Sequence, residues 1–321
     1  METKDMIKIE KYFSTHDIDS VADWVEEAIT IKKNPLGYKE YGQNKTIAML
    51  FFNPSLRTRL STQKAAVHLG MNVIVMNFNG EGWSLEYNDG TIMDQGTSEH
   101  VKEAAQVVSQ YCDVLAIRAF ASLESKEDDY SEKVIKSFVK YASVPIINME
   151  SATAHPLQAL TDAMTITEHM TKKRPKVVFS WAPHPKPLPQ AVANSFVEMI
   201  KRMDVDFVCT YPEGYELARH ITEGVTTTHD QEAALKDADF VYVKNWSSYA
   251  DYGKVLSTDT SWKMTAKKME LTNNAKFMHC LPVRRNVVVD DEVLDGANSL
   301  VIEQANNRTY AAQLVLKKML E

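Results

Sequence analysis

The chain has 321 residues, of which 44% are hydrophobic and 25% charged, and its formal net charge is −7. This length suits about two globular domains, and the acidic balance argues against a nucleic-acid partner, which needs a basic face. Three scattered cysteines without a CxxC pair, a polar N-terminus and the lack of a long apolar run argue against disulfides, a zinc site and a membrane span, and favour a cytoplasmic protein.

Predicted helices and strands alternate along the first half of the chain. Ser14 to Asp17 has the composition of a helix cap, and an amphipathic run follows it to Lys33. Short apolar runs predict buried strands over residues 46–52, 72–77, 114–118 and 144–149. Helical patterns fall at 55–69, 98–111 and 131–141, and residues 78–91, which contain three glycines, are predicted to form a loop.

The second half repeats this alternation. Strands are predicted over residues 176–181, 206–210, 239–244 and 277–280, and helices over 190–202 and 304–320. The pattern predicts an α/β protein of two Rossmann-like, three-layer domains, each a mostly parallel sheet flanked by helices. We place these domains at residues 1–150 and 151–321, and we expect the last helix to pack back on the first domain.

The most informative segment is the junction between the strand at 46–52 and the helix after it. Pro54 breaks the strand and favours a helix start, so the next residues present backbone N–H groups that attract anions. Two hydroxyls and two guanidinium groups are added within the next turn and a half, and such a set suits a phosphate dianion. They belong to Ser55, Arg57, Thr58 and Arg59. A surface helix with paired arginines is the alternative.

Further polar residues follow other predicted strands or open helices, where α/β proteins bind ligands. They are Arg118, His155, Gln158, His279, Cys280 and Arg308, the last at the predicted start of the final helix. Taken singly, Arg118 could be a surface residue and His155 a structural one. Cys280 beside His279 could be a thiol nucleophile, but no acidic third member is evident, and we favour a role for the backbone carbonyls. A dinucleotide site is not expected, because Gly80-Glu81-Gly82 lacks the third glycine.

Together these motifs resemble the aspartate/ornithine carbamoyltransferase family in identity, order and approximate spacing, over essentially the whole chain. The motifs are Ser55-x-Arg57-Thr58-Arg59, Arg118, His155-Pro156-x-Gln158 and His279-Cys280-Leu281-Pro282. The resemblance implies transfer of a carbamoyl group from carbamoyl phosphate to an amine, without a metal or cofactor. It also implies a homotrimer whose active sites lie between subunits.

The resemblance assigns roles to individual residues. The phosphate would be held by Ser55, the Leu56 N–H, Arg57, Thr58 and Arg118, with Trp83 reaching in from a neighbouring subunit. Three residues would act on the carbamoyl oxygen and the charge near it, namely His155, Thr58 and Arg308. The carbamoyl NH₂ would be held by Gln158 and by the Cys280 and Leu281 carbonyls.

The acceptor amine is indicated by a departure from the relatives that use free ornithine. Where they carry an aspartate that holds the α-ammonium, this chain has Lys244, which would repel that group. A second departure is the proline-rich turn over residues 181–189. Both features resemble the branch of the family that uses Nα-acylated ornithine in arginine synthesis, and the acceptor would contact Glu150, Lys244 and Arg284.

The acyl group is indicated by Ser98. Acetyl-using members tend to carry a glutamate at this position and succinyl-using ones a proline. A glutamate would repel a succinyl carboxylate and a serine would not, so N-succinyl-L-ornithine is favoured over N-acetyl-L-ornithine. Free ornithine or aspartate as acceptor, a catalytically silent ligand-binding relative and a nicotinamide-dependent dehydrogenase are the alternatives.

Overall fold

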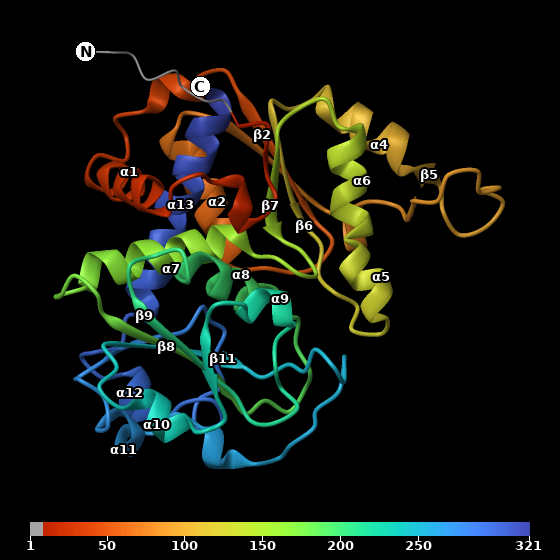
Figure 1. Ribbon diagram of the computed structural model, residues 1–321. Coiled ribbons are helices and arrows are strands. Elements are labelled where there is room, and N and C mark those ends of the chain that lie inside the picture. Colours follow the sequence, from red (N-terminus) through yellow and green to blue (C-terminus); the bar gives the residue numbers. More distant parts are fainter. Residues whose placement is uncertain (1–8) are drawn as a thin grey trace. The chain divides into compact units, whose positions relative to one another are not determined.

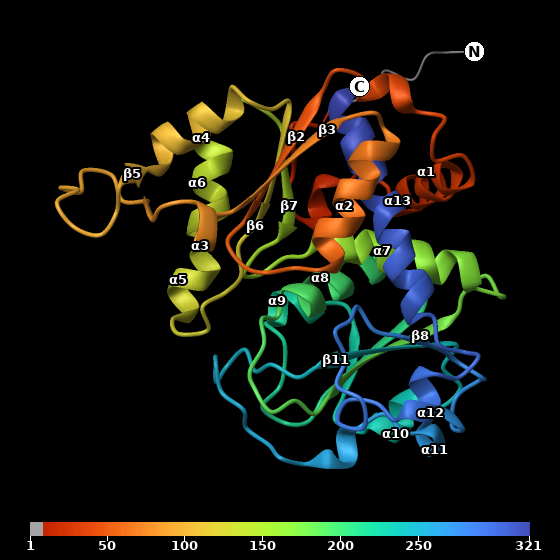
Figure 2. The same cartoon turned by 180° about the vertical axis from the view of Figure 1, so that it is seen from behind.

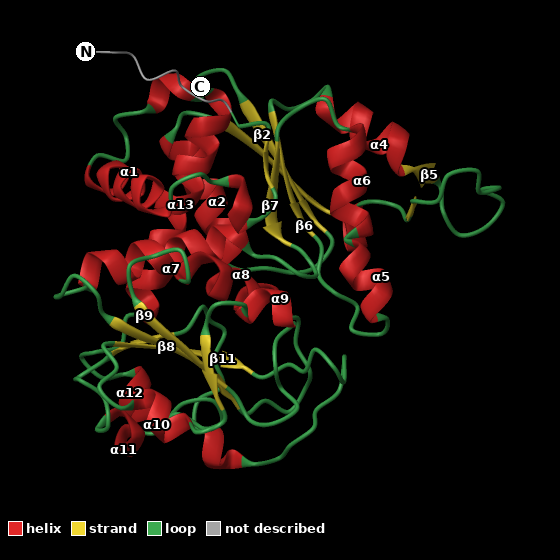
Figure 3. Cartoon of the chain, in the orientation of Figure 1, coloured by secondary structure: helices red, strands yellow, loops and turns green. Residues whose placement is uncertain are grey.

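The computed structural model describes residues 9–321, which form two compact units (Figure 1). The described residues up to 121, together with 127–157 and 308–321, belong to the first unit, and residues 122–126 and 158–307 to the second. Each unit contains one parallel sheet of five strands with helices on both faces (Figure 3). The predicted α/β architecture is therefore confirmed.

The sheet of the first unit has the order β1-β7-β6-β2-β3. The residues of β2, β6 and β7 are almost all buried, as their continuous apolar runs predicted. A separate two-stranded sheet joins β4 (Leu85–Glu86) to β5 (Glu99–His100). The strands of the main sheet are β1 (Lys11–Tyr12), β2 (Thr46–Phe51), β3 (Asn72–Asn77), β6 (Val114–Arg118) and β7 (Ile146–Glu150).

Helices cover both faces of this sheet. Apolar residues of α4 and α6 pack on β2 and β6, while α1, α2 and the C-terminal part of α13 lie on the opposite face (Figures 1 and 2). The last helix is tied to the first by the ion pair between Lys317 Nζ and Glu27 Oε1 at 3.0 Å. The helices that contribute to this unit are α1 (Val21–Lys33), α2 (Arg57–His68), α3 (Phe78–Glu81), α4 (Val101–Ser109), α5 (Lys126–Ser131), α6 (Lys133–Tyr141) and α13 (Val301–Leu320).

The sheet of the second unit has the order β10-β9-β8-β11-β12. The aromatic ring of Phe196 on α8 stacks on that of Tyr242 on β11 at a centroid distance of 4.0 Å, and α10 and α12 pack on the opposite face. The strands are β8 (Lys176–Ala182), β9 (Asp206–Thr210), β10 (Thr226–Thr228), β11 (Phe240–Asn245) and β12 (Lys276–Met278). The helices are α7 (Pro156–His169), α8 (Ala191–Ile200), α9 (Arg219–Thr222), α10 (Gln231–Leu235), α11 (Ala266–Met269) and α12 (Asp291–Leu294).

Several local predictions were wrong. Ser14 and Asp17 form a capping box on a short 3₁₀ helix, whereas α1 begins at Val21 with Ser20 as its N-cap. The predicted loop over 78–91 contains α3 and β4. The final helix begins at Val301, so Arg308 lies two turns inside it.

None of the helices formed by residues 9–321 is both long and apolar enough to cross a membrane.

Candidate active site

The strand order of the first sheet reverses between β2 and β6, because the chain leaves β2 for β3 on one side and later returns to β6 on the other. Ligands of open α/β sheets bind beyond the carboxyl ends of the strands at such a point. Here the register sets Phe51 of β2 level with Arg118 of β6, and Arg118 level with Glu150 of β7. A buried cation and a buried carboxylate therefore end adjacent strands.

The helix that follows β2 has an N-terminus suited to an anion. No side chain caps α2, and its first turn contains no acidic residue. The first N–H groups of a helix have no intrahelical acceptor and carry the positive end of its dipole. The loop before α2 is fixed to the end of β6, since the Phe120 N–H donates to Asn53 Oδ1 at 2.6 Å and the Phe52 N–H to the Arg118 carbonyl at 2.9 Å.

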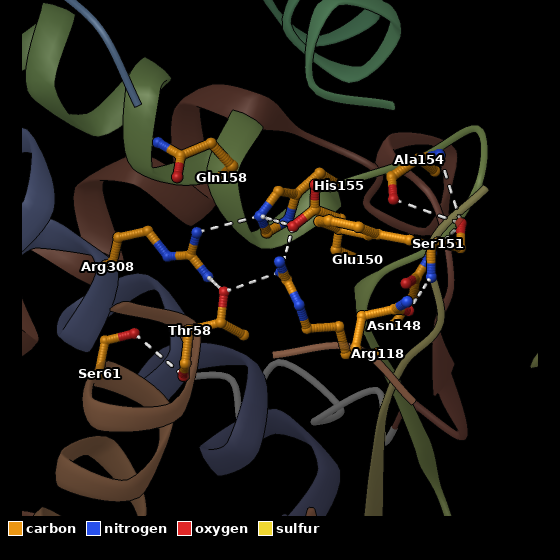
Figure 4. Close-up of polar contacts among 12 residues, drawn as sticks. Thr58, Ser61, Arg118, Asn148, Glu150, Ser151, Ala154, His155, Gln158 and Arg308 are labelled. Carbon is orange, nitrogen blue, oxygen red and sulfur yellow. Dashed lines mark hydrogen bonds and ion pairs between the residues drawn. The ribbon is translucent and has the colours of Figure 1, made fainter. Parts of the chain in front are cut away.

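Five buried side chains form a closed ring of polar contacts (Figure 4). Thr58 Oγ1 accepts from Arg118 Nη1 at 3.4 Å and from Arg308 Nη2 at 3.1 Å. Arg118 Nη1 also donates to Glu150 Oε2. The ring is closed by His155 Nε2, which lies 3.2 Å from Glu150 Oε2 and 3.1 Å from Arg308 Nη1. We call these five residues, Thr58, Arg118, Glu150, His155 and Arg308, the polar ring.

The polar ring carries an excess of positive charge, because two guanidinium groups face a single carboxylate. A net positive charge among these five side chains suits the binding of an anion. The two contacts of His155 Nε2 suit different tautomers of the ring. Arg308 can only donate to an unprotonated Nε2, whereas Glu150 accepts a proton from it. Which of the two contacts is a hydrogen bond therefore depends on the tautomer of His155.

A buried carboxylate fixes the turn that carries His155. Glu132 Oε1 accepts from Ser151 Oγ at 2.7 Å, from the Thr153 N–H at 2.7 Å and from Thr153 Oγ1 at 2.5 Å. Within the turn, the Ser151 N–H donates to the Ala154 carbonyl at 2.8 Å. Pro156 then opens α7. Glu132 was not predicted as a buried residue, because an acidic residue just before an amphipathic helix gives no sign of burial.

In the second unit the strand order reverses between β8 and β11. The register sets Lys244 level with Trp181, and Asn245 level with Ala182. Lys244 is only 8% exposed, which is unusual for a lysine and places its charge in a dry environment. The residues that follow β8 begin the proline-rich turn that the sequence singled out, and they include His184.

His184 joins the predicted acceptor residues of this unit, although sequence analysis did not name it as a site residue. Arg284 Nε donates to His184 Nε2 at 3.1 Å, and His184 Nδ1 donates to the Lys186 carbonyl at 2.7 Å. The imidazole is thus neutral. Burial lowers its pKa most, and the charges of Arg284, Lys244 and Lys186 lower it further, against the Lys186 carbonyl, which raises it. Its position directly after a strand end could have identified it.

The lowered pKa of His184 predicts a loss of stability in acid. Between that pKa and the ordinary histidine value of about 6.5, the unfolded chain binds a proton that the folded chain does not. The free energy of unfolding should therefore fall as the pH drops below about 6.5. Urea midpoints of the wild type and His184→Gln at about pH 7.5 and 5.5 measure this contribution, and an equal loss in both proteins would contradict it.

The His279-Cys280-Leu281 turn does not provide a base for the thiol. His279 Nδ1 accepts from the Leu281 N–H at 2.9 Å, and Nε2 donates to Asn245 Oδ1 at 3.5 Å. Both ring nitrogens are thus engaged in holding the turn, which favours a role for the backbone carbonyls of Cys280 and Leu281. Gln158 lies in the first turn of α7 and donates to Asp162 Oδ1 at 2.7 Å.

Trp83 and Ser98 lie on the segment that contains β4 and β5. Trp83 is 58% exposed and donates from Nε1 to Glu99 Oε2 at 2.7 Å. The Ser98 N–H donates to the Ser84 carbonyl at 3.2 Å. These contacts are local to the segment, and the roles of both residues stay predictions.

Comparison with known families identifies both halves of the chain. Residues 4–168 match the model of the aspartate/ornithine carbamoyltransferase carbamoyl-P binding domain, and residues 189–319 match that of the Asp/Orn binding domain of the same enzymes. The N-succinylornithine carbamoyltransferase of Bacteroides fragilis is 49% identical over 98% of this chain and 99% of its own length. The N-acetylornithine carbamoyltransferase of Xanthomonas campestris is 38% identical over 90% of this chain and 91% of its own length.

Solved structures agree with these relationships. Acetylornithine transcarbamylase complexed with acetylcitrulline matches with a TM-score of 0.90 at 35% identity, over 97% of this chain and 99% of that one. A glutamate-to-serine variant of N-acetyl-L-ornithine transcarbamylase, complexed with carbamyl phosphate and N-succinyl-L-norvaline, matches with a TM-score of 0.89 at 34% identity, over 96% of this chain and 99% of that one. The family models, the near full-length relatives and the two parallel sheets agree: this chain belongs to the aspartate/ornithine carbamoyltransferase family.

Proposed function

We propose that the protein transfers the carbamoyl group of carbamoyl phosphate to the δ-amine of N-succinyl-L-ornithine, giving N-succinyl-L-citrulline and phosphate, as a step of arginine biosynthesis. The observation that carries this proposal is the buried Lys244, whose charge would repel an α-ammonium and attract a carboxylate. N-acetyl-L-ornithine is the second candidate acceptor, because relatives that use each acceptor match nearly the whole chain.

The first unit carries the groups that suit carbamoyl phosphate. The phosphate would accept from the start of α2 through Ser55, Leu56, Arg57 and Thr58, and from Arg118. Its charge would balance the two guanidinium groups of the polar ring. With a proton on Nε2, His155 would donate to the carbamoyl oxygen as negative charge develops there, which is the largest contribution that a preorganised site usually makes.

The second unit carries the groups that suit the acceptor and the carbamoyl amide. Lys244 and Arg284, with His184 beside them, would hold the carboxylates of the acceptor. Glu150 is also proposed to contact the acceptor. Gln158 and the Cys280 and Leu281 carbonyls would accept from the carbamoyl NH₂. Arg308 would hold Thr58 in place and help to balance the charge near the carbamoyl oxygen.

The amine must lose a proton to attack. A free δ-amine has a pKa of about 10, so supplying its neutral form near neutral pH costs about 4 kcal/mol. We propose that the departing phosphate accepts this proton and that orientation of the two substrates supplies much of the rate. The carbonyl carbon gains the C–N bond, the C–O bond to phosphate breaks, and the proton leaves with the phosphate.

We also propose a cytoplasmic homotrimer in which Trp83 reaches the site of a neighbouring copy. Its support in the structure is the exposure of large apolar side chains where a partner could cover them. Leu56, Leu60 and Val67 of the α2 region are each more than half exposed, as is Trp83.

The test of the function is product formation from carbamoyl phosphate with three acceptors at equal concentration. We expect N-succinyl-L-ornithine to be used best, N-acetyl-L-ornithine less well and free L-ornithine least, by at least about a hundredfold in kcat/KM. Citrulline-type products are measured colorimetrically. Preferential use of free ornithine would show that our interpretation of Lys244 is wrong, and the absence of turnover with all three would favour a silent binding protein.

Replacing Ser98 by glutamate should change the preference between acyl groups. A glutamate near the acyl chain would repel the succinyl carboxylate and leave the neutral acetyl group unaffected, so the ratio of kcat/KM for the succinyl over the acetyl substrate should fall at least about tenfold. The support is the relative in which a glutamate-to-serine change accompanies a bound N-succinyl-L-norvaline. Ser98→Gln, which adds the same volume without charge, is the control and should keep more of the succinyl preference.

A further inference from the structure

A buried carboxylate that the proposed mechanism does not use lies in the middle of α7. Asp162 is fully buried, and its Oδ1 accepts from Gln158 Nε2 at 2.7 Å and from Gln304 Nε2 at 2.7 Å. Hydrogen bonds to an ionised acceptor are shorter and stronger than those between neutral groups. Asp162 thus joins the start of α7 to the N-terminal part of α13 through two side-chain amides.

The carboxylate of Asp162 fixes the orientation of the side-chain amides of Gln158 and Gln304. A carboxylate only accepts, so the NH₂ group of each amide must face Asp162 and the carbonyl oxygen must face away. Turning either amide round would place its oxygen against the carboxylate. For Gln304 the result is visible, because its Oε1 accepts from the His279 N–H at 3.0 Å. His279 in turn holds the Leu281 N–H.

We propose that Asp162 is a positioning residue that selects carbamoyl phosphate by orienting the groups that hold the carbamoyl NH₂; this rests on the function proposed above. Through Gln158 it turns one amide oxygen away from the helix core as an acceptor. Through Gln304 and His279 it sets the turn that presents the Cys280 and Leu281 carbonyls. One carboxylate therefore orients both the side-chain oxygen of Gln158 and the turn that carries the Cys280 and Leu281 carbonyls, which together would accept from the carbamoyl NH₂.

The surroundings keep these hydrogen bonds dry. The phenol of Tyr242 lies against Asp162 and Cys280, and burial first, then the charge of Asp162, raises the pKa of Tyr242 well above its ordinary value. In a region of low dielectric a hydrogen bond to a carboxylate is stronger, and an amide without it is more costly to bury.

Asp162 could instead have a purely structural role, which would be to join α7 to α13. A second buried residue that also links these two helices provides the control. Thr165 is also fully buried, lies one turn further along α7, and accepts from Asn307 Nδ2 of α13 at 3.0 Å. It makes no contact with either glutamine among the hydrogen bonds of the described residues. Thr165→Val should therefore weaken the helix pair without changing how carbamoyl phosphate is recognised.

The experiment compares two ligands that differ only in the group at issue. Acetyl phosphate has a methyl where carbamoyl phosphate has NH₂, and both carry the same phosphate. Dissociation constants are measured by titration calorimetry. We expect Asp162→Leu to weaken the binding of carbamoyl phosphate at least about tenfold and the binding of acetyl phosphate less than about twofold. Asp162→Asn, which keeps one acceptor oxygen, should recover part of the preference, and Thr165→Val should keep it all.

Each result decides between explanations. The positioning role would be overturned if Asp162→Leu weakened the binding of both ligands equally, or if it left the preference for carbamoyl phosphate over acetyl phosphate unchanged. If the leucine variant does not fold, Asp162→Asn carries the test with a smaller expected change in preference of about threefold, and an unchanged preference there overturns the proposal. If the wild type itself does not prefer carbamoyl phosphate, the proposed function fails first.

Discussion

Replacing Arg118 by leucine should lower kcat/KM for carbamoyl phosphate by about a thousandfold, the loss typical of removing one preorganised donor to developing charge. Arg118 Nη1 contacts both the hydroxyl of Thr58 and the carboxylate of Glu150. Its removal takes an ion-pair partner from the buried Glu150, which should also lower the free energy of unfolding by about 3 kcal/mol. Steady-state kinetics and urea denaturation measure the two effects.

Two further variants separate folding from chemistry in this experiment. Lys45→Met removes the partner of Asp113 in an exposed ion pair of the same unit, at 3.0 Å, and should cost less than about 1 kcal/mol with no effect on kcat/KM. The double replacement of Arg118 and Glu150 by leucine removes both buried charges, so it should recover much of the stability but none of the activity. Recovery of activity with stability would mean that Arg118 serves only to neutralise Glu150.

Replacing Lys244 by methionine should lower kcat/KM for N-succinyl-L-ornithine by about a hundredfold, equivalent to about 2.7 kcal/mol. The side chain keeps its length and loses its charge, so a carboxylate of the acceptor loses its partner in a buried environment. Binding of carbamoyl phosphate should change less than about twofold. The measurements are acceptor-dependent product formation and direct titration with carbamoyl phosphate.

Lys201 provides the control for this variant. It is a half-buried lysine of the same unit, and its Nζ donates to the Ile221 carbonyl at 3.0 Å. Lys201→Met should leave the use of all three acceptors unchanged. Undiminished turnover of N-succinyl-L-ornithine by Lys244→Met would show that Lys244 does not bind a carboxylate of the acceptor.

Most of the strands could be predicted from the sequence, and the five residues of the polar ring were named as candidates, because both signals depend on short stretches of the chain. A strand buried on both faces must be a continuous apolar run, and a ligand-binding residue in such a fold tends to follow that run directly. Arg118 was chosen as a candidate in this way, whereas Lys244 was chosen because it departs from the relatives that use free ornithine. The short strands β1 and β10, of two and three residues, carry no such signal.

Long-range contacts explain what was missed. The last helix was predicted to begin at residue 304, with Arg308 near its start, whereas it begins at Val301. Asn307, a residue of low helix propensity, is held within this helix because its Nδ2 donates to Thr165 Oγ1 at 3.0 Å and to Glu168 Oε2 at 2.7 Å. Glu132 was not predicted because its donors, Ser151 and Thr153, lie about twenty residues further along the chain. For Asp162 the nearby donor Gln158 was named for another role, and the second donor, Gln304, lies far away in the chain.

The division of α13 bears on how the protein is made. Residues 308–321 belong to the first unit, although residues 158–307, which belong to the second, precede them in the chain. During synthesis the second unit is therefore fully translated before Arg308 leaves the ribosome. Until then Thr58 and His155 lack one of the guanidinium groups that contact them, so the polar ring closes only after residues 158–307 have been made.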